Sequence, residues 1–457
     1  MGDDRFEKHL RQVVQNINYE FQEGRLSAIN LVSTIIEKLP EPLLEKHAHL
    51  FFLPLVVQLA NDDSKECRES VAASLSALLK RSPTVLLQSF YDYALRWSNN
   101  EGSLRATSLQ IFGIFIESRV DFFSRGNAAE ALIERVKSLL EESQNDWEIP
   151  YFSLICVEKL WKCFPRKLAV IGSLWNSVVQ NLVHSHPWIK LAASRLFNSL
   201  LIESGIESSI RVDIKSLFTQ ERGILFQVIR NICFQLNLEE DEQNADLSEF
   251  AIKSLASLLP LIHSEPHLCF TTDESFNESG NKSRDPVLWL MTRLCSIARP
   301  KGHKRREAVF KCFAAFIARH CHLVMPHLEL MLEPLHRSTT EASNELEKSS
   351  RAAWRQTNAY ELSVSSELEL ARDVLQLLEE NCGATSEFLR AYAAVKTRAT
   401  EKKQQRKIAA KTEAVLDPQA AAKRTIQKHD REKRRKKRRV EEWRRGRGVT
   451  TKQINSS

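Results

Sequence analysis

The chain has 457 residues, of which 43% are hydrophobic, and it carries a formal net charge of +7. A chain of this length can bury a large core, and its 13 glycines and 14 prolines are fewer than a turn-rich β-sandwich or doubly wound α/β fold usually contains. The composition therefore argues against those folds and favours helices joined by short loops.

The sequence predicts neither a signal for secretion nor a segment that spans a membrane. Residues 1–10 are charged and lack the apolar core of a secretory signal, and the densest apolar run, residues 50–57, is too short to cross a bilayer. The nine cysteines are scattered without a CxxC pair, which is typical of free thiols in a reducing compartment. We expect a soluble protein of the cytosol or nucleus, without disulfides and without a membrane partner.

Residues 53–79 carry the clearest local pattern. Apolar residues at helical spacing predict two helices, separated by the polar stretch at 61–64. This stretch contains two aspartates and a serine, and any of the three can cap the second helix by accepting hydrogen bonds from its first backbone N–H groups. With Pro54 in the first helix and Arg68 at the start of the second, the segment resembles a HEAT repeat.

The second helix of this pair has a pattern that recurs along the chain: a basic residue at position i, a small or apolar residue at i+3, and apolar residues at i+7 and i+10. Five copies have the base, and they are Arg25, Ala28, Val32 and Ile35; Arg68, Val71, Leu75 and Leu78; Arg105, Ser108, Phe112 and Phe115; Lys190, Ala193, Phe197 and Leu200; and Arg306, Val309, Phe313 and Phe316. Two copies lack the base, and they are Pro150, Ser153, Val157 and Leu160, and Ser248, Ala251, Leu255 and Leu258.

The spacing of these copies decides between two architectures. The pattern alone is that of any amphipathic helix, so a non-repeating helical bundle is the alternative. The lead position, however, advances by 43, 37, 45 and 40 residues and then twice by 58, and the first four steps match the roughly 40–47 residues of a HEAT or armadillo unit. The longer steps contain the polar segments 237–246 and 264–285, which we interpret as loop insertions. We predict an all-α, HEAT/armadillo-like helical-repeat solenoid over residues 1–385.

No motif in the chain predicts catalysis. GxSxG, GxGxxG, Walker and HExxH sequences are all missing. The best metal candidates are Cys312, His320, Cys321, His322 and His327. Consecutive residues of a helix point in different directions, so this set does not form a tetrahedral site, and core thiols with surface histidines are expected instead. We predict a protein that is not an enzyme and has no cofactor, metal or small-molecule substrate.

Aromatic residues in the middle of the chain admit two interpretations. Trp147, Trp161, Trp175 and Trp188 lie among aliphatic residues, so we predict that they belong to the core rather than to a platform that stacks nucleic-acid bases. Residues 184–188, His-Ser-His-Pro-Trp, are predicted to be a turn in which the proline opens the next helix.

The composition changes after Phe388, where apolar residues become sparse. Residues 396–448 contain 21 Lys and Arg residues against seven Asp and Glu residues, whereas the rest of the chain apart from Lys452 contains 43 bases and 51 acids. Residues 386–457 are therefore predicted to be a basic, partly helical or disordered C-terminal tail, with a helix start at Asp417-Pro418.

Bases packed this closely cannot all be paired within the tail, and binding to phosphates would release condensed counterions. The tail is thus predicted to bind RNA, without base-specific readout, while the seven bases at 433–439 also satisfy a nuclear import signal. The two interpretations are compatible. The candidate residues for RNA binding or import are Lys396, Arg398, Lys402, Lys403, Arg406, Lys407, Lys411, Lys423, Arg424, Lys433, Arg434, Arg435, Lys436, Lys437, Arg438, Arg439, Arg444 and Arg445.

The order of segments in the tail resembles a known family. A last repeat helix precedes a basic helix, an acidic-proline turn, an Ala-Ala-Lys segment and a terminal Lys/Arg block, at residues 367–380, 396–411, 417–418, 420–423 and 433–439. This order is similar to the C-terminal region of the giant HEAT-repeat component of the small-subunit processome, the Down-Regulated-In-Metastasis protein family. Members of that family are several times longer, so the resemblance implies that this chain corresponds to their C-terminal section.

The resemblance also implies a function. It is that of a scaffold in the nucleus and nucleolus that holds pre-ribosomal RNA and processome proteins during assembly of the small ribosomal subunit, and that supports pre-rRNA cleavage without performing it. An import receptor would then bind the basic tail. The alternative is a HEAT-repeat adaptor that binds proteins in nuclear transport or chromatin, in which the tail is only an import signal.

Overall fold

The computed structural model describes most of the chain, namely residues 3–100, 104–142, 146–203, 218, 223–236, 243–269, 285–300, 303–350, 359–381, 385–419, 422–427, 429–431, 433–434 and 437. In these residues the regular structure is helical throughout, with no strand. The chain divides into two units, residues 1–381 and residues 382–457, which are described separately.

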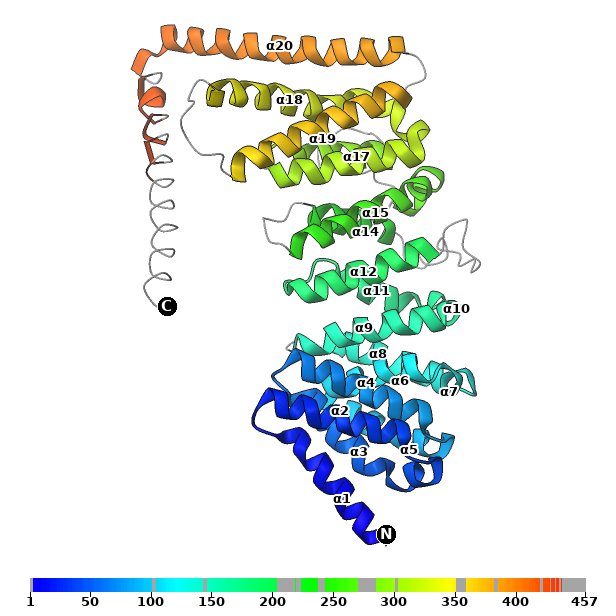
Figure 1. Cartoon of the computed structure of the whole chain (residues 1–457). Coiled ribbons are helices and arrows are strands. Elements are labelled where there is room, and N and C mark those ends of the chain that lie inside the picture. Colours follow the sequence, from blue (N-terminus) through cyan, green and yellow to red (C-terminus); the bar gives the residue numbers. More distant parts are fainter. Residues whose placement is uncertain are drawn as a thin grey trace, which may run out of the picture. The chain divides into compact units, whose positions relative to one another are not determined.

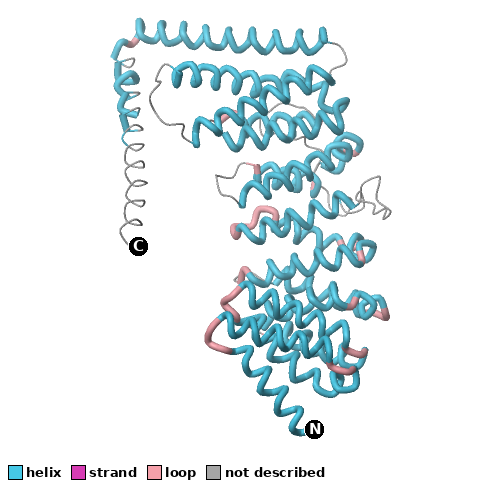
Figure 2. Tube along the Cα trace, in the orientation of Figure 1, coloured by secondary structure: helices cyan, strands magenta, loops and turns pink. Residues whose placement is uncertain are grey.

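The helices of the first unit alternate between two layers, so that successive antiparallel pairs stack on one another (Figures 1 and 2). The first helices of the pairs are α1 (Asp3–Gln15), α3 (Glu41–Asn61), α5 (Thr84–Asn99), α8 (Ala128–Glu142), α11 (Gly172–Asn181), α14 (Ile224–Gln235), α16 (Pro286–Ala298) and α18 (Leu328–Ser350). The second helices are α2 (Gln22–Lys38), α4 (Lys65–Arg81), α6 (Leu104–Ser118), α9 (Glu148–Cys163), α12 (Pro187–Glu203), α15 (Gln243–Ser264), α17 (His303–Val324) and α19 (Ala359–Asn381).

Short helices occupy several of the connections. They are η1 (Asn16–Asn18), α7 (Val120–Ser124), α10 (Pro165–Ala169), η2 (Pro266–Cys269) and η3 (Met325–His327).

The recurring sequence pattern marks the second helices. Its seven copies lie in α2, α4, α6, α9, α12, α15 and α17. Each of these helices packs against its own first helix and against the neighbouring second helices, which for α2 is α4 alone. The side chains at i+3, i+7 and i+10 are buried in every copy except at Ile35, which is half-buried. A pair with apolar surface on two sides buries it only by stacking. The predicted all-α helical-repeat solenoid is confirmed.

Aromatic side chains carry the core from one pair to the next. Phe52 on α3 stacks on Phe90 of α5 with ring centroids 4.1 Å apart, and Trp161 on α9 meets Trp175 of α11 edge to face at 5.3 Å. All four rings are buried. Fully burying a large apolar side chain stabilises the folded state by about 1.5–3 kcal/mol. These ring contacts therefore stabilise the stacking of neighbouring pairs, and they make the core continuous from one pair to the next.

The turn between α3 and α4 shows which cap the chain uses. Of the three candidate residues, Ser64 caps α4, because its Oγ accepts the backbone N–H of Cys67 at 3.3 Å. Asp62 instead turns inward and is buried. Its carboxylate accepts hydrogen bonds from Arg25 of the preceding helix pair.

The two predicted loop insertions lie partly outside the described residues, namely at 237–242 and 270–284. The structure differs from the prediction at residues 243–246, which form the first turn of α15 rather than a loop. Asp246 in that turn favours a helix start, since an acidic side chain interacts well with the helix N-terminus. In the second segment, Ser264 still belongs to α15, and Asp285 caps α16 by accepting the N–H of Val287 at 2.9 Å.

The most apolar long helical segment runs from Lys304 to Glu341, and by length and composition alone it could cross a membrane. The backbone, however, is non-helical at His320 (φ −143°, ψ 47°) and forms η3 at Met325–His327. The three phenylalanines of this segment, Phe310, Phe313 and Phe316, are fully buried. The segment is therefore a core helix pair, α17 and α18.

The second unit begins with α20 (Thr385–Leu416), a helix of 32 residues with a length of about 48 Å. The helix ends before Asp417, and Pro418 is helical again. This break agrees with the helix start predicted at Asp417-Pro418.

Candidate nucleic-acid interface

Helix α20 brings seven of the predicted RNA-binding bases together. All seven side chains are exposed, and they are Lys396, Arg398, Lys402, Lys403, Arg406, Lys407 and Lys411. Residues four, seven and eleven apart share a helix face, so Lys396, Lys403 and Lys407 form one row. Arg398, Lys402 and Arg406 follow one another at four-residue spacing and form a second row. The seven bases together span about 22 Å of helix.

The charge of this stretch is one-sided. Between Lys396 and Leu416 only Glu401 and Glu413 are acidic. Like charges three or four residues apart on a helix repel one another, so these bases destabilise the free helix slightly and a polyanion would relieve the repulsion. Alanine and glutamine between the bases have high or moderate helix propensity, which keeps the stretch helical.

The remaining candidate residues follow α20. Lys423, Arg424, Lys433, Arg434 and Lys437 are helical and exposed, and Arg424 forms an ion pair with Glu413. The other members of the predicted set lie outside the described residues, and they are Arg435, Lys436, Arg438, Arg439, Arg444 and Arg445.

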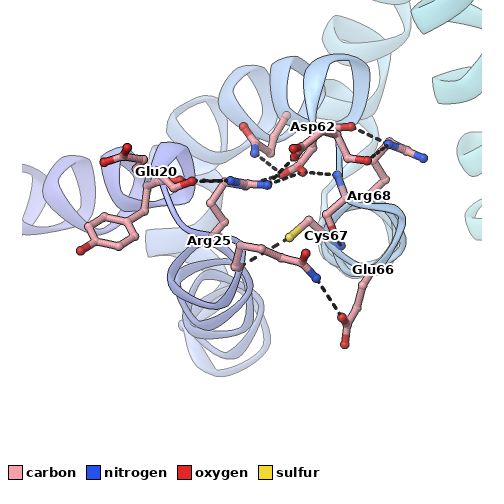
Figure 3. A network of polar contacts seen from close by, with 11 residues as sticks. Glu20, Arg25, Asp62, Glu66, Cys67 and Arg68 are labelled. Carbon is pink, nitrogen blue, oxygen red and sulfur yellow. Dashed lines mark hydrogen bonds and ion pairs between the residues drawn. The ribbon is translucent and has the colours of Figure 1, made fainter. Parts of the chain in front are cut away.

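The basic lead residues of the repeat pattern have a different role, which sequence reasoning missed. Figure 3 shows Arg25 of α2 between two turns of the chain. Its Nε and Nη2 donate to Asp62 Oδ2 and Oδ1, each at 3.0 Å, and Nη2 also donates to Asp63 Oδ1 at 2.6 Å. Its Nη1 donates to the carbonyl of Glu20 at 3.0 Å. Arg25 therefore joins its own turn to the turn of the next pair.

Asp62 is held in its ionised form. Burial alone raises the pKa of its carboxyl group, but hydrogen bonds from Arg25, from the backbone N–H of Ser64 and from the Gln58 side chain outweigh this effect and bring the pKa below its usual value. A bidentate guanidinium–carboxylate pair of this kind is both strong and directional. The pair fixes the stacking of the first two helix pairs.

Other lead bases act in the same way. Arg105 donates to the carbonyl of Asn100 in its own turn at 2.7 Å and lies 3.9 Å from Glu142 at the end of α8. Arg306 donates to the carbonyl of Ala298 at 3.2 Å and pairs with Glu341 and Glu367 at 3.0 and 3.1 Å. These bases are committed to contacts within the solenoid.

The tryptophans separate into two groups. Trp161 and Trp175 are buried, so the core prediction is confirmed for them. For Trp147 and Trp188 the prediction is wrong, because 37% and 44% of their surface is exposed. Both lie at the N-terminal ends of second helices, Trp147 directly before α9 and Trp188 in the first turn of α12. Pro187 does open α12, as predicted.

The Cys and His residues considered for metal binding do not converge. Cys312 is fully buried on α17 beside Phe313, and burial raises the pKa of its thiol well above the usual value. Within the described ranges, no three His, Cys, Asp or Glu side chains are grouped so that they could hold a metal ion.

The chain matches one family over most of its length. The family model for the C-terminal region of small subunit processome component 20 homologs covers residues 104–442. The chain belongs to this family. The resemblance inferred from the tail is thereby confirmed.

Two curated relatives carry the name U3 small nucleolar RNA-associated protein 20. The chain is 25% identical over 438 residues to the protein of Schizosaccharomyces pombe, covering 92% of this chain and 16% of the relative. It is 23% identical over 446 residues to the protein of Saccharomyces cerevisiae, covering 95% of this chain and 17% of the relative. The chain thus spans less than a fifth of the length of either protein.

Similar solved structures include the karyopherin Kap121p, alone (TM-score 0.52, 12% identity) and bound to the SUMO protease Ulp1p (TM-score 0.53, 11% identity). Each comparison covers 83% of this chain and 33% of the karyopherin. At such low identity the likeness concerns the fold alone, and it agrees with a helical-repeat solenoid.

Proposed function

We propose that this chain is part of a non-catalytic scaffold of the small-subunit processome, which works in the nucleolus in pre-rRNA processing and small ribosomal subunit assembly. The match to the processome family over residues 104–442 carries this proposal. The names of the two relatives, which associate those proteins with U3 small nucleolar RNA, support it. A solenoid suits the role because stacked pairs present a long surface to several partners.

The two parts of the chain have separate tasks in this proposal. Residues 1–385 bind processome proteins, and residues 386–457 bind pre-ribosomal RNA through phosphates. The exposed rows of bases on α20 support the second task, whereas Arg25 and Arg306 are engaged within the solenoid. Phosphate contacts place a protein on RNA without selecting a sequence, so specificity comes from other parts of the assembly.

The bases at 433–439 serve import in the same proposal. A run of seven Lys and Arg residues has the composition that import receptors recognise. RNA binding by α20 and import by the later block are separable, since they involve different residues.

The proposal is tested by immunoprecipitating the tagged chain from cells and sequencing the RNA that accompanies it. We expect enrichment of small-subunit precursor RNA over mature rRNA. Recovery of no such precursor would contradict the processome role.

A second experiment distinguishes the scaffold from a protein-binding adaptor whose tail only directs import. The seven α20 bases are replaced by glutamine in the full chain, and an unrelated import signal is added. Loss of precursor RNA with normal nuclear entry supports RNA binding by α20. Normal pre-rRNA processing in cells that carry this variant would favour the adaptor.

A further inference from the structure

Four rings meet at the N-terminal ends of α9 and α12, and we call them the aromatic cluster: Trp147, Tyr151, His186 and Trp188. The rings of Trp147 and His186 are stacked, with an angle of 8° between their planes and with centroids 4.6 Å apart. Trp188 meets Trp147 edge to face at 5.1 Å, and Tyr151 lies 6.1 Å from Trp188. The cluster thus joins the starts of two successive second helices.

The aromatic cluster stands where other pairs are joined by ions. In α2 and α6 the lead bases bridge to the next pair, but the lead residue of α9 is Pro150, which has no charge. Ring contacts take the place of the lead-base ion pair here, while Arg195 of α12 pairs with Glu158 of α9 at 2.6 Å farther along the two helices. This role accounts for the packing of the rings, but it leaves Trp147 and Trp188 more than one-third exposed. Grouped exposed apolar side chains are characteristic of interaction sites.

The surroundings of the cluster favour an anionic ligand. Lys190, one turn after His186, is half-buried, and burial lowers the pKa of its ammonium group. It has no ion-pair partner in the described part of the chain. Burial, together with the nearby His186 and Lys190, also lowers the pKa of His184. The adjacent Asp146 accepts the backbone N–H of Glu148, the first residue of α9, through its Oδ1 at 3.0 Å.

We propose that the aromatic cluster stacks unpaired bases of RNA and that Lys190 binds a neighbouring phosphate. The inference rests on the proposed association with RNA and adds a site for single strands. Planar rings with one exposed side extend readily into a stack with bases, and such stacking is sequence-tolerant. An apolar peptide would cover the rings but leave the ammonium group of Lys190 without a counter-charge.

The test uses the full chain and two oligomers with equal numbers of phosphates: a single-stranded RNA decamer and an abasic ribose-phosphate decamer. We expect the protein to bind the base-containing oligomer about tenfold more tightly, which corresponds to one stacked base. The variant Trp147→Leu/Trp188→Leu should lose this preference and keep its affinity for the abasic oligomer. Phe234→Leu, at an exposed ring of α14, is the matched control and should keep the preference.

The comparison of the two oligomers with the unmodified protein is sufficient to refute the inference. Equal affinity for the two oligomers would overturn it and would point to a protein ligand for the cluster. Lys190→Gln provides a second variant that leaves the rings in place, and it should make the salt dependence of binding less steep by about 0.7 in log–log slope. An unchanged slope would overturn the assigned phosphate contact. Absence of binding to either oligomer would instead contradict the proposed RNA association itself.

Discussion

The lead arginine Arg306 of the solenoid and the lysines of α20 have opposite surroundings. Arg306 is 4% exposed and pairs with two carboxylates, whereas Lys403 and Lys407 lie on an exposed helix with few acids. A buried base needs a charged partner, because an uncompensated charge that is removed from water strongly destabilises the folded state. An exposed base contributes little to stability and stays available to a ligand. Burial, rather than the charge itself, separates the bases that stabilise the solenoid from those that remain available to a ligand.

The largest expected effect concerns the core of the solenoid. Phe112→Ala on α6 should lower the free energy of unfolding by about 3–5 kcal/mol, since it removes a fully buried ring from the contact with Tyr91. Urea unfolding followed by circular dichroism measures the change. Ile408→Ala on α20, where the side chain is 63% exposed, is the control and should change it by about 0.5 kcal/mol or less. Equal losses in the two variants would remove the distinction between the regions.

Breaking the buried ion network should have the next largest effect. Arg306→Ala leaves Glu367 buried without this partner and should cost about 3 kcal/mol. The double variant Arg306→Met/Glu367→Leu, measured by the same unfolding experiment, should recover most of the loss. No uncompensated charge then stays buried, because Glu341, the other partner of Arg306, is 38% exposed. A double variant as unstable as the single one would show that the pair itself, rather than the uncompensated charge, determines the effect.

Asp62 provides a smaller effect that depends on pH. Asp62→Asn should cost about 2 kcal/mol at pH 7, because it replaces the ionised acceptor of Arg25. The pKa of Asp62 is lowered in the folded protein, so its stabilisation is present above the unfolded value and is lost as pH falls through the folded value. The difference between the two proteins should therefore be constant from about pH 5 to 7 and shrink below about pH 4.

Asp63→Asn is the matched control for that experiment. Asp63 also pairs with Arg25, but its side chain is 89% exposed, so the loss should be about 0.5 kcal/mol. A loss as large as that of Asp62→Asn would contradict the link between burial and stabilisation.

The smallest effect on stability is expected for α20. Replacement of Lys396, Lys403, Lys407 and Lys411 by glutamine should change the free energy of unfolding by about 0.5 kcal/mol or less. The same variant should reduce the log–log salt slope of RNA binding by up to about 2.8, at 0.7 per lost phosphate contact. Binding at several salt concentrations measures this slope.

Four exposed lysines of the solenoid serve as the control for α20, namely Lys8, Lys38, Lys65 and Lys80. Their replacement by glutamine makes the same change in net charge but should leave most of the slope. If both sets reduced the slope equally, RNA binding would depend on total charge rather than on the rows of α20.

Several features could be predicted because they depend on neighbours in sequence. Residues three or four positions apart share a helix face, so the pattern at Arg68, Val71, Leu75 and Leu78 identified a second helix and its buried side. The tail was visible as a change in composition, and the order of its segments was sufficient for the family. The first turn of α15 was missed because three of the residues 243–246 are polar and the segment has no apolar period.

By itself the sequence determined the repeating second helices and the charge contrast between solenoid and tail, since both follow from local spacing and composition. Only the tertiary structure decided that Arg25 meets Asp62, 37 residues away, and that Trp147 and Trp188 remain partly exposed at the edge of two pairs. Both outcomes depend on how successive pairs stack. The same residue types are therefore structural at one position and available for binding at another.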